Sequence, residues 1–240
     1  MTFLLVHDDR EYLRAPGEEL QTDLGVLTVP EDAEPGDVLE THLGTEFVVR
    51  APRGPDLFDH FERTGAPMMP RDVGLVVGLT GVAAGDRVLD AGTGTGVLAA
   101  YLGRLGAEVT TYERDPEFAE VARENMRLAG VEERVTVHAG DLTDALDSRS
   151  GFDVLTLDTE DAPEVVRHAP DLLVSGGFVA VYAPFVEGSR AAVEAAREAD
   201  LRDVHTYETI QREMDFGDRG SRPSTRGVGH TGYLTVARHE

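Results

Sequence analysis

The pattern of hydrophobic and polar residues changes at about residue 70. Up to that point short β-type runs, such as FLLV, GVLTV and EFVVR, are separated by Gly, Pro and acidic clusters. No segment there has the apolar spacing of a helix, so we expect a small β-rich domain over residues 1–54. Residues 55–70 hold three prolines and a short amphipathic stretch. We expect them to form a linker that packs on a domain of residues 71–240.

From residue 71 onward, strand-like and helix-like segments alternate. The strand-like segments are Val88–Ala91, Val109–Tyr112, Val135–His138, Val154–Leu157 and Phe178–Tyr182. The helix-like segments are Arg71–Leu79, Val97–Leu105, Pro116–Ala129, Glu164–Val174 and Ser189–Ala199. This alternation predicts a doubly wound α/β domain with a mostly parallel sheet.

Local signals support several of these boundaries. Asp115 followed by Pro116 is typical of a helix start, and Gly130 is typical of a residue that follows a helix end. The Gly176-Gly177 pair is expected to precede the fifth strand.

The composition excludes some classes of protein. With 240 residues, 41% of them hydrophobic, the chain can bury a full core. No apolar run approaches the roughly 18 residues of a membrane span, and the N-terminus lacks a basic region and a cleavage site, so we expect a cytoplasmic protein. There is no cysteine, and the eight histidines show no HExxH-like spacing. A metal enzyme is therefore disfavoured.

The charge balance is unusual. There are 45 acidic residues against 22 basic ones, and every basic residue is arginine. This composition resembles that of haloarchaeal proteins, in which carboxylates hold hydration and cations while multimolar salt screens their repulsion. On that interpretation the net charge of −23 reflects the solvent. An acidic protein with a cationic partner is the alternative, but it does not explain the missing lysine.

A glycine-rich turn follows the first strand of the α/β domain. The strand ends near Asp90, and the turn runs through Gly92, Thr93, Gly94, Thr95 and Gly96 to a helix that begins at Val97. Backbone N–H groups at the carboxyl end of a strand form a crevice that can hold a nucleotide. A dinucleotide fingerprint would place its last glycine at Val97, and a Walker A loop would need a lysine.

The pattern of an acidic residue followed by Gly-x-Gly-x-Gly instead resembles the first motif of class I S-adenosylmethionine-dependent methyltransferases. The resemblance implies a Rossmann-like fold in which Glu113, at the end of the second strand, binds the ribose of S-adenosylmethionine. It places Asp141 near the adenine, with Arg114 and Leu142 beside these two acids. The alternatives are that both carboxylates are only solvated loop residues or helix caps, and that the turn holds no ligand.

Asp158 follows the fourth strand and should reach the same edge of the sheet. Methyl transfer needs an in-line approach and a place for a released proton, which one carboxylate can supply. We expect its pKa near the reference value of about 4, at which a carboxylate is a weak base. Alternatively, Asp158 only caps the next turn.

Three further segments narrow the resemblance to one family within this class of methyltransferases. They are the stretches Thr22–Leu27, Asp161–Pro184 and Arg222–Arg238, the last of which contains GHTGYL. Together they resemble the archaeal tRNA N1-adenine methyltransferases that act at positions 57 and 58 of the T-loop. The resemblance implies a small N-terminal β-domain, a Rossmann-like catalytic domain and a homotetramer.

The resemblance also implies roles for individual residues. Asp158 takes the proton of the target adenine, and His230, Tyr233 and Tyr182 lie beside the acceptor pocket. Two segments depart from the family pattern. Residues 159–163 replace a loop that usually ends in Pro-Trp, and Ala66-Pro67 replaces a Gln-Ile pair.

An arginine-rich segment near the C-terminus is the candidate tRNA contact. Between residues 217 and 230 there are Arg219, Arg222, Arg226 and His230 against the single acid Asp218. Guanidinium groups keep geometric specificity for phosphate where salt screens long-range attraction. The alternative is a loop paired with acidic neighbours or with another subunit.

We therefore expect a tRNA (adenine-N1)-methyltransferase that uses S-adenosylmethionine and needs no metal or membrane. Two alternatives stay open. One is a methyltransferase for proteins, as in the isoaspartate enzymes with a similar glycine motif, or for small molecules. The other is an RNA-binding homologue without activity.

Overall fold

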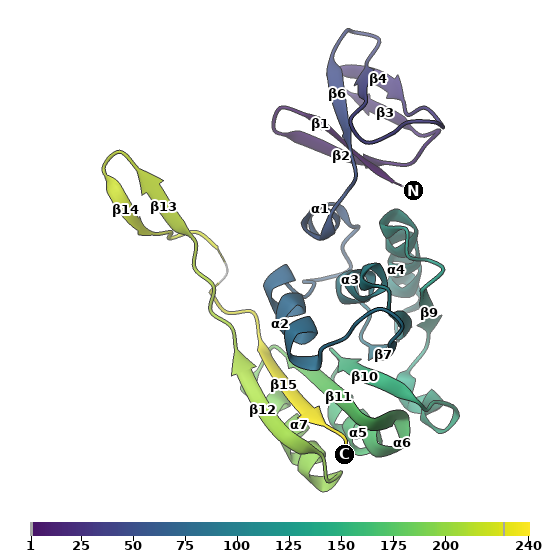
Figure 1. Ribbon diagram of the computed structural model, residues 1–240, viewed down its shortest axis with the longest axis vertical. Coiled ribbons are helices and arrows are strands. Elements are labelled where there is room, and N and C mark those ends of the chain that lie inside the picture. The colour runs from purple at the N-terminus through teal and green to yellow at the C-terminus, as the bar shows by residue number, and fades with distance from the viewer. Residues whose placement is uncertain (1, 228) are drawn as a thin grey trace.

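The computed structural model describes residues 2–227 and 229–240. The N-terminal strands form one end of the molecule, the α/β part forms its body, and a two-stranded hairpin projects away from that body (Figure 1). Among the described residues, no helix is long and apolar enough to cross a membrane.

The N-terminal part is built from antiparallel strands. They are β1 Phe3–His7, β2 Arg10–Arg14, β3 Glu19–Thr22, β4 Gly25–Thr28, β5 Val38–Glu40 and β6 Glu46–Arg50. Four of them form a sheet in the order β2-β1-β6-β5, and β3 pairs with β4. Alternate residues of β1 face two cores: Phe3 and Leu5 pack with Phe47, whereas Leu4 and Val6 join the core of the body. The prediction that this region is rich in β-structure is confirmed.

The predicted linker contains a short helix, α1 Gly54–His60. Leu57 on this helix is buried in the same cluster as Val76 of α2 Pro70–Thr80 and Leu102 of α3 Val97–Leu105. The segment thus packs on the body as expected, while the domain boundaries at residues 54 and 70 stay a prediction.

The body contains a seven-stranded sheet in the order β12-β15-β11-β10-β7-β8-β9. These strands are β7 Arg87–Ala91, β8 Glu108–Glu113, β9 Val135–Ala139, β10 Phe152–Leu157, β11 Leu173–Ala183, β12 Arg202–Glu208 and β15 Tyr233–Arg238. The five strands from β11 to β9 are parallel, and β15 is antiparallel to both β11 and β12. Strand order reverses at β7, and such a switch point opens a crevice at the carboxyl ends of the strands.

Helices cover both faces of this sheet. The remaining helices are α4 Pro116–Ala129, the 3-10 helix η1 Leu142–Ser148, α5 Ala162–Arg167, α6 Ala169–Leu172 and α7 Val186–Glu198. Val88 and Val154 face the core that includes α2, α3 and α4, whereas Leu89 and Leu155 face η1, α5, α6 and α7. As predicted, Asp115 caps α4 by accepting hydrogen bonds from the next turn.

One predicted helix is wrong in its extent. The segment 164–174 forms two short helices, α5 and α6, and β11 already begins at Leu173. Pro170 explains the break, because a proline lacks the N–H that would continue the first helix. The Gly176-Gly177 pair lies inside β11 rather than before it, at a pairing irregularity where Gly176 has a φ of 85°.

Four C-terminal strands are absent from the sequence prediction. Besides β12 and β15 they are β13 Met214–Gly217 and β14 Gly220–Pro223, which form the projecting hairpin. Most residues of β12, β13 and β14 are exposed, so these strands lack the buried face that produces a hydrophobic alternation.

Candidate active site

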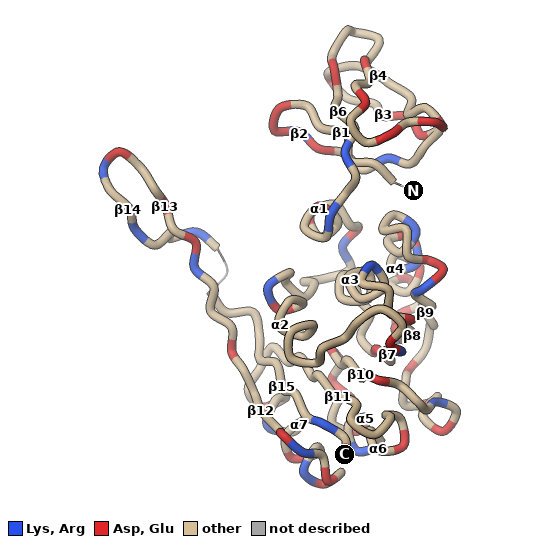
Figure 2. Tube along the Cα trace, viewed as in Figure 1, with Lys and Arg blue, Asp and Glu red and all other residues tan. Residues whose placement is uncertain are grey.

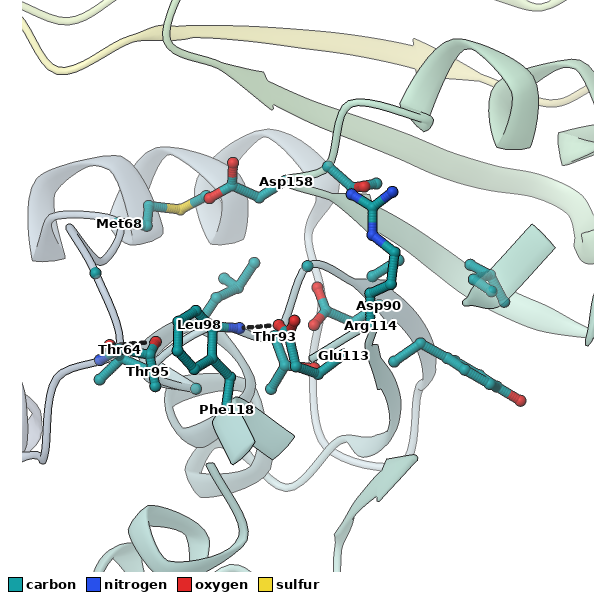
Figure 3. Close-up of a pocket in the computed structure, with 18 of the residues that line it drawn as sticks. Thr64, Met68, Asp90, Thr93, Thr95, Leu98, Glu113, Arg114, Phe118 and Asp158 are labelled. Atoms are coloured by element: carbon teal, nitrogen blue, oxygen red, sulfur yellow. Dashed lines mark hydrogen bonds between the residues drawn. The ribbon is translucent and has the colours of Figure 1, made fainter. Parts of the chain in front are cut away.

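A cavity of about 380 Å³ lies at the carboxyl ends of β7, β8, β9 and β10. Figure 3 shows Asp90, Glu113 and Asp158 around it. The predicted cofactor residues all line it: Asp90, Gly92, Thr93, Gly94, Thr95, Gly96, Val97, Glu113, Arg114, Asp141, Leu142 and Asp158. Residues 64–68 line the cavity as well. Of these, the sequence analysis singled out only Ala66 and Pro67.

The three glycines of the turn share a backbone conformation that favours glycine, and two of them also lie close to a neighbouring segment. All have positive φ, at 85°, 51° and 82° for Gly92, Gly94 and Gly96. A Cβ atom on Gly92 would lie 2.0 Å from the Asp158 carbonyl oxygen, and one on Gly96 would lie 2.6 Å from Cε of Met126. Gly92 therefore lets the turn touch the strand that carries Asp158, and Gly96 lets it touch α4.

Four N–H groups of this turn have partners within the chain. Gly92 and Thr93 donate to the Tyr112 carbonyl oxygen, and Gly96 donates to that of Thr93. Gly94 donates to Oε2 of Glu113 over 2.8 Å, as the dashed line in Figure 3 shows. A turn that cradles phosphate presents free N–H groups, whereas these four are bonded within the chain.

The charge of the cavity is mainly negative. Among the described residues, six carboxylates and one guanidinium line it: Asp90, Glu113, Asp141, Asp158, Glu160, Asp161 and Arg114. The single guanidinium is itself paired with Asp161 at 3.2 Å. Such a cavity repels a phosphate and favours a neutral or cationic ligand.

Glu113 and Asp141 keep binding capacity toward the cavity. The Glu113 carboxylate accepts the N–H groups of Gly94 and Asp115, which leaves lone pairs for two hydroxyl groups. Asp141 caps η1, since its Oδ1 accepts hydrogen bonds from the N–H and the hydroxyl of Thr143, each at 2.9 Å. Asp141 is thus a helix cap, which was one of the alternatives for it. Its Oδ2 atom takes no part in the cap and can still accept a hydrogen bond from a ligand.

Asp90 lies beneath the cavity in a network of threonines. Its two oxygens accept hydrogen bonds from the hydroxyls of Thr111 and Thr156, each at 2.5 Å. Burial raises the pKa of Asp90, and the two threonine hydroxyls oppose that shift by stabilising the carboxylate.

Asp158 combines a fixed position with an altered acidity. Its N–H donates to the carbonyl oxygen of Ala91, which fixes the residue at the end of β10. Burial and the charge of Asp90 raise the pKa of Asp158 to about 7. The expectation of an ordinary pKa near 4 was wrong, because the sequence does not reveal how deeply Asp158 is buried or that Asp90 lies close by. At neutral pH this carboxylate is a much better proton acceptor than expected.

Asn125 connects the linker to the glycine turn. This fully buried residue of α4 accepts the N–H of Glu62 and donates to the carbonyl oxygens of Glu62 and Thr95. Thr64 N–H adds a hydrogen bond to the hydroxyl of Thr95. We call residues 62–68 the strap, because these bonds hold it along the cavity. The sequence analysis missed Asn125, although an asparagine on the apolar face of a helix is a usable signal.

A second group of polar side chains lies beside Asp158. Thr231, just before β15, donates to Oδ2 of Asp72 over 2.7 Å and accepts from Arg71 over 3.1 Å. Tyr182 of β11 lies next to this segment, since a Cβ atom on Gly232 would be 2.8 Å from the tyrosine oxygen. Burial raises the pKa of Tyr182, and the charges of Asp72 and Asp158 act in the same direction. Of these residues, only Tyr182 was predicted.

The predicted C-terminal residues lie outside the set that lines the cavity. His230 is exposed, with Nδ1 2.8 Å from Glu208 and its ring 5.0 Å from that of Tyr233. Arg226 pairs with Asp215. Thus two of the four expected cationic groups have acidic partners, whereas Arg219 and Arg222 are exposed on the hairpin. Val228, within the stretch used for the resemblance, lies outside the described residues.

Comparison with known proteins identifies the family of the chain. Residues 60–220 match the family described as the tRNA methyltransferase complex GCD14 subunit. The chain belongs to this family. The tRNA (adenine(57)-N(1)/adenine(58)-N(1))-methyltransferase TrmI of Methanocaldococcus jannaschii is 35% identical to it over 95% of this chain and 91% of that protein.

Solved structures identify the fold that this GCD14 family member adopts. A SAM-dependent O-methyltransferase from Thermotoga maritima has a TM-score of 0.82 and 26% identity, covering 99% of this chain and 92% of that one. The tRNA (m1A58) methyltransferase TrmI from Aquifex aeolicus has a TM-score of 0.75 and 23% identity, covering 99% and 96%. The fold is the Rossmann-like class I methyltransferase fold, extended by N-terminal antiparallel strands, as the resemblance implied.

Both segments in which this family member departs from the usual pattern border the cavity. Thr159, Glu160 and Asp161 line one part of it, and Ala66 and Pro67 in the strap line another. The departures therefore change the walls of the site and leave the glycine turn intact.

Proposed function

We propose that this protein transfers a methyl group from S-adenosylmethionine to N1 of adenine at positions 57 and 58 in the T-loop of tRNA. The observation that carries the proposal is the similarity, over 95% of the chain, to an archaeal enzyme named for that reaction. Protein and small-molecule substrates are less well supported, because that similarity includes the N-terminal strands and the C-terminal hairpin as well as the cofactor turn.

The cavity fits S-adenosylmethionine, which is cationic at its sulfonium and has no phosphate. In our proposal Glu113 accepts the ribose hydroxyls, Asp141 binds near the adenine, and the strap contacts the methionine end. The support is the acidic lining and the glycine turn, in which four N–H groups already have partners within the chain. When bound, S-adenosylmethionine supplies an electrophilic methyl group.

Asp158 is our candidate for the proton acceptor. As N1 of adenine becomes methylated, its exocyclic amine becomes more acidic, and the Asp158 carboxylate receives the proton. A pKa of about 7 suits this task, because the group is ionised in much of the protein at neutral pH and still holds a proton well. Tyr182 keeps its own proton, since burial raises its pKa.

Contact with tRNA is proposed for the hairpin side of the molecule. Figure 2 shows both basic and acidic residues on the hairpin, as it does on the rest of the chain. In a chain of net charge −23, exposed Arg219 and Arg222 offer guanidinium groups for phosphates, and His230 and Tyr233 offer rings for stacking. Recognition would then depend on geometry more than on net attraction.

We further propose a cytoplasmic homotetramer that works in multimolar salt. Exposed apolar side chains on and next to the hairpin support self-association, since Ile210 is 68% exposed, Met214 44% and Phe216 80%. The excess of carboxylates and the absence of lysine support the salt requirement.

One assay tests the proposal. The protein is incubated in multimolar KCl with labelled S-adenosylmethionine and unmodified tRNA, and 1-methyladenosine is mapped. Label at positions 57 or 58 is expected. Label that enters protein instead would favour a protein methyltransferase, and binding of tRNA without any methyl transfer would favour an inactive RNA-binding homologue.

A further inference from the structure

The side-chain amide of Asn125 is fully engaged with two main-chain segments. Its Oδ1 accepts the N–H of Glu62 over 3.2 Å, and its Nδ2 donates to the carbonyl oxygens of Glu62 at 3.0 Å and Thr95 at 2.9 Å. Both amide hydrogens and the amide oxygen therefore have partners. Asn125 is 0% exposed and is not among the described residues that line the cavity. Any contribution it makes to the site comes through the two segments it joins.

The strap and the glycine turn also meet beside Asn125. The N–H of Thr64 donates to the hydroxyl of Thr95 over 3.2 Å. Farther along the strap, no described residue forms a hydrogen bond with the main chain of residues 65–68. The carbonyl oxygen of Met69 then accepts the first N–H groups of α2. Hydrogen bonds thus fix the main chain of this wall at its two ends, to the glycine turn and to α2.

The strap lies on the other side of the cavity from the proposed ribose ligand. Residues 64–68 and Glu113 line the same cavity. In Figure 3, Thr64 and Met68 lie to the left of the cavity, whereas Glu113 lies farther to the right. A molecule of S-adenosylmethionine whose ribose is held by Glu113 therefore extends its methionine end toward the strap.

We propose that Asn125 is a positioning residue for the cofactor, which holds the strap where it receives the methionine end of S-adenosylmethionine. This inference rests on the proposed function. Without the amide, the strap has to be ordered each time the cofactor binds, and this ordering lowers the affinity. The loss applies only to ligands that reach the strap. Asn125 thus controls the affinity for one end of the ligand without touching the ligand.

The test compares two ligands that differ at the methionine end. S-Adenosylhomocysteine carries an amino acid there, whereas methylthioadenosine has the same adenosine and sulfur but no amino acid. Calorimetric titration in molar KCl measures both dissociation constants for the unaltered protein and for Asn125→Ala. In this variant the affinity for S-adenosylhomocysteine should fall by about tenfold, and that for methylthioadenosine should stay within about twofold.

Kinetics supply a second readout. With T-arm RNA as acceptor, Asn125→Ala should raise KM for S-adenosylmethionine by about tenfold and leave kcat within about threefold at saturating cofactor. The reason is that Asp158 keeps its position, since its N–H donates to the carbonyl oxygen of Ala91. A loss that lies in kcat while KM is unchanged contradicts a positioning role for Asn125.

Further variants separate positioning from a loss of structure. Thr80→Val is the matched control, because it removes another buried hydrogen bond, to the carbonyl oxygen of Val76, at the end of α2 away from the strap. It should lower stability and change neither affinity. Thr95→Val removes the second attachment of the strap and should act like Asn125→Ala, but more weakly. Thr95→Ser keeps the hydroxyl and should restore the affinity.

The outcomes distinguish the two proposals. If the unaltered protein binds the cofactor but transfers no methyl group to T-arm RNA, the proposed reaction fails, and the binding comparison still decides the inference. If Asn125→Ala weakens both ligands by the same factor, or neither, the inference is overturned. Should Asn125→Ala fail to fold, Thr95→Val replaces it, and an unchanged ratio of the two dissociation constants in that variant overturns the inference as well.

Discussion

The carboxyl edge of the sheet has two sides that are built differently. On the cofactor side, the residues of the glycine turn contact one another and the ends of neighbouring parallel strands. On the other side, next to the start of β15, Asp72 and Thr231 meet although they are separated by 159 positions. The first kind of site leaves a short motif in the sequence. The second depends on two distant segments coming together, and only the folded chain reveals it.

The largest expected effect is that of a substitution in the glycine turn, on the cofactor side of the edge. In Gly92→Ala the new Cβ atom would lie 2.0 Å from the Asp158 carbonyl oxygen, in addition to the strain of a positive φ. We expect the free energy of unfolding to fall by about 3 kcal/mol or more, together with loss of S-adenosylmethionine binding. Denaturant unfolding and calorimetric titration measure the two.

Gly85→Ala is the control for that variant. Gly85 has a similar φ of 91° but no atom within 4 Å of an added Cβ, so only strain remains, at about 1 kcal/mol. Equal losses in the two variants would contradict the close approach of the turn to Asp158.

The second test concerns Asp158 and pH. Asp158→Asn should lower methyl transfer by about 10²-fold or more, and in the unaltered protein transfer should rise as pH increases through about 7. The folded-state pKa is raised above the unfolded value, so the folded state holds an extra proton between about pH 4 and 7 and stability falls as pH rises through that window.

At pH 8 Asp158→Asn should therefore be more stable than the unaltered protein, by on the order of 2 kcal/mol, and this difference should vanish near pH 4. Thermal unfolding across pH measures it. A difference that is constant with pH would mean that Asp158 titrates normally.

The smallest expected effect concerns the hairpin, our proposed contact with tRNA. Replacing both Arg219 and Arg222 with serine should weaken tRNA binding by about two- to fivefold in 2 M KCl, and by more as salt is lowered, because screening then decreases. Arg134→Ser is a suitable control, since Arg134 pairs with Glu108 away from the hairpin. If both variants bind tRNA equally well, the hairpin is not a phosphate contact.

The same contrast explains how far the sequence could predict the molecule. The parallel strands, their helices and the cavity residues from Gly92 to Asp158 follow from buried periodicity and local turn chemistry. The exposed strands β12, β13 and β14 carry no such periodicity. Asn125, Asp72 and Thr231 gain their importance from partners distant in sequence. The raised pKa of Asp158 likewise depends on its burial in the folded chain and on the charge of Asp90.

The way Asn125 holds the strap has a consequence for how this enzyme could vary. The amide binds only main-chain atoms of Glu62 and Thr95, so this attachment of the strap does not depend on the side chains of Ala66 and Pro67. Ala66 and Pro67 can therefore be exchanged without detaching the wall of the cavity. The strap is a natural position at which to redesign the pocket for cofactor analogues with larger transferable groups.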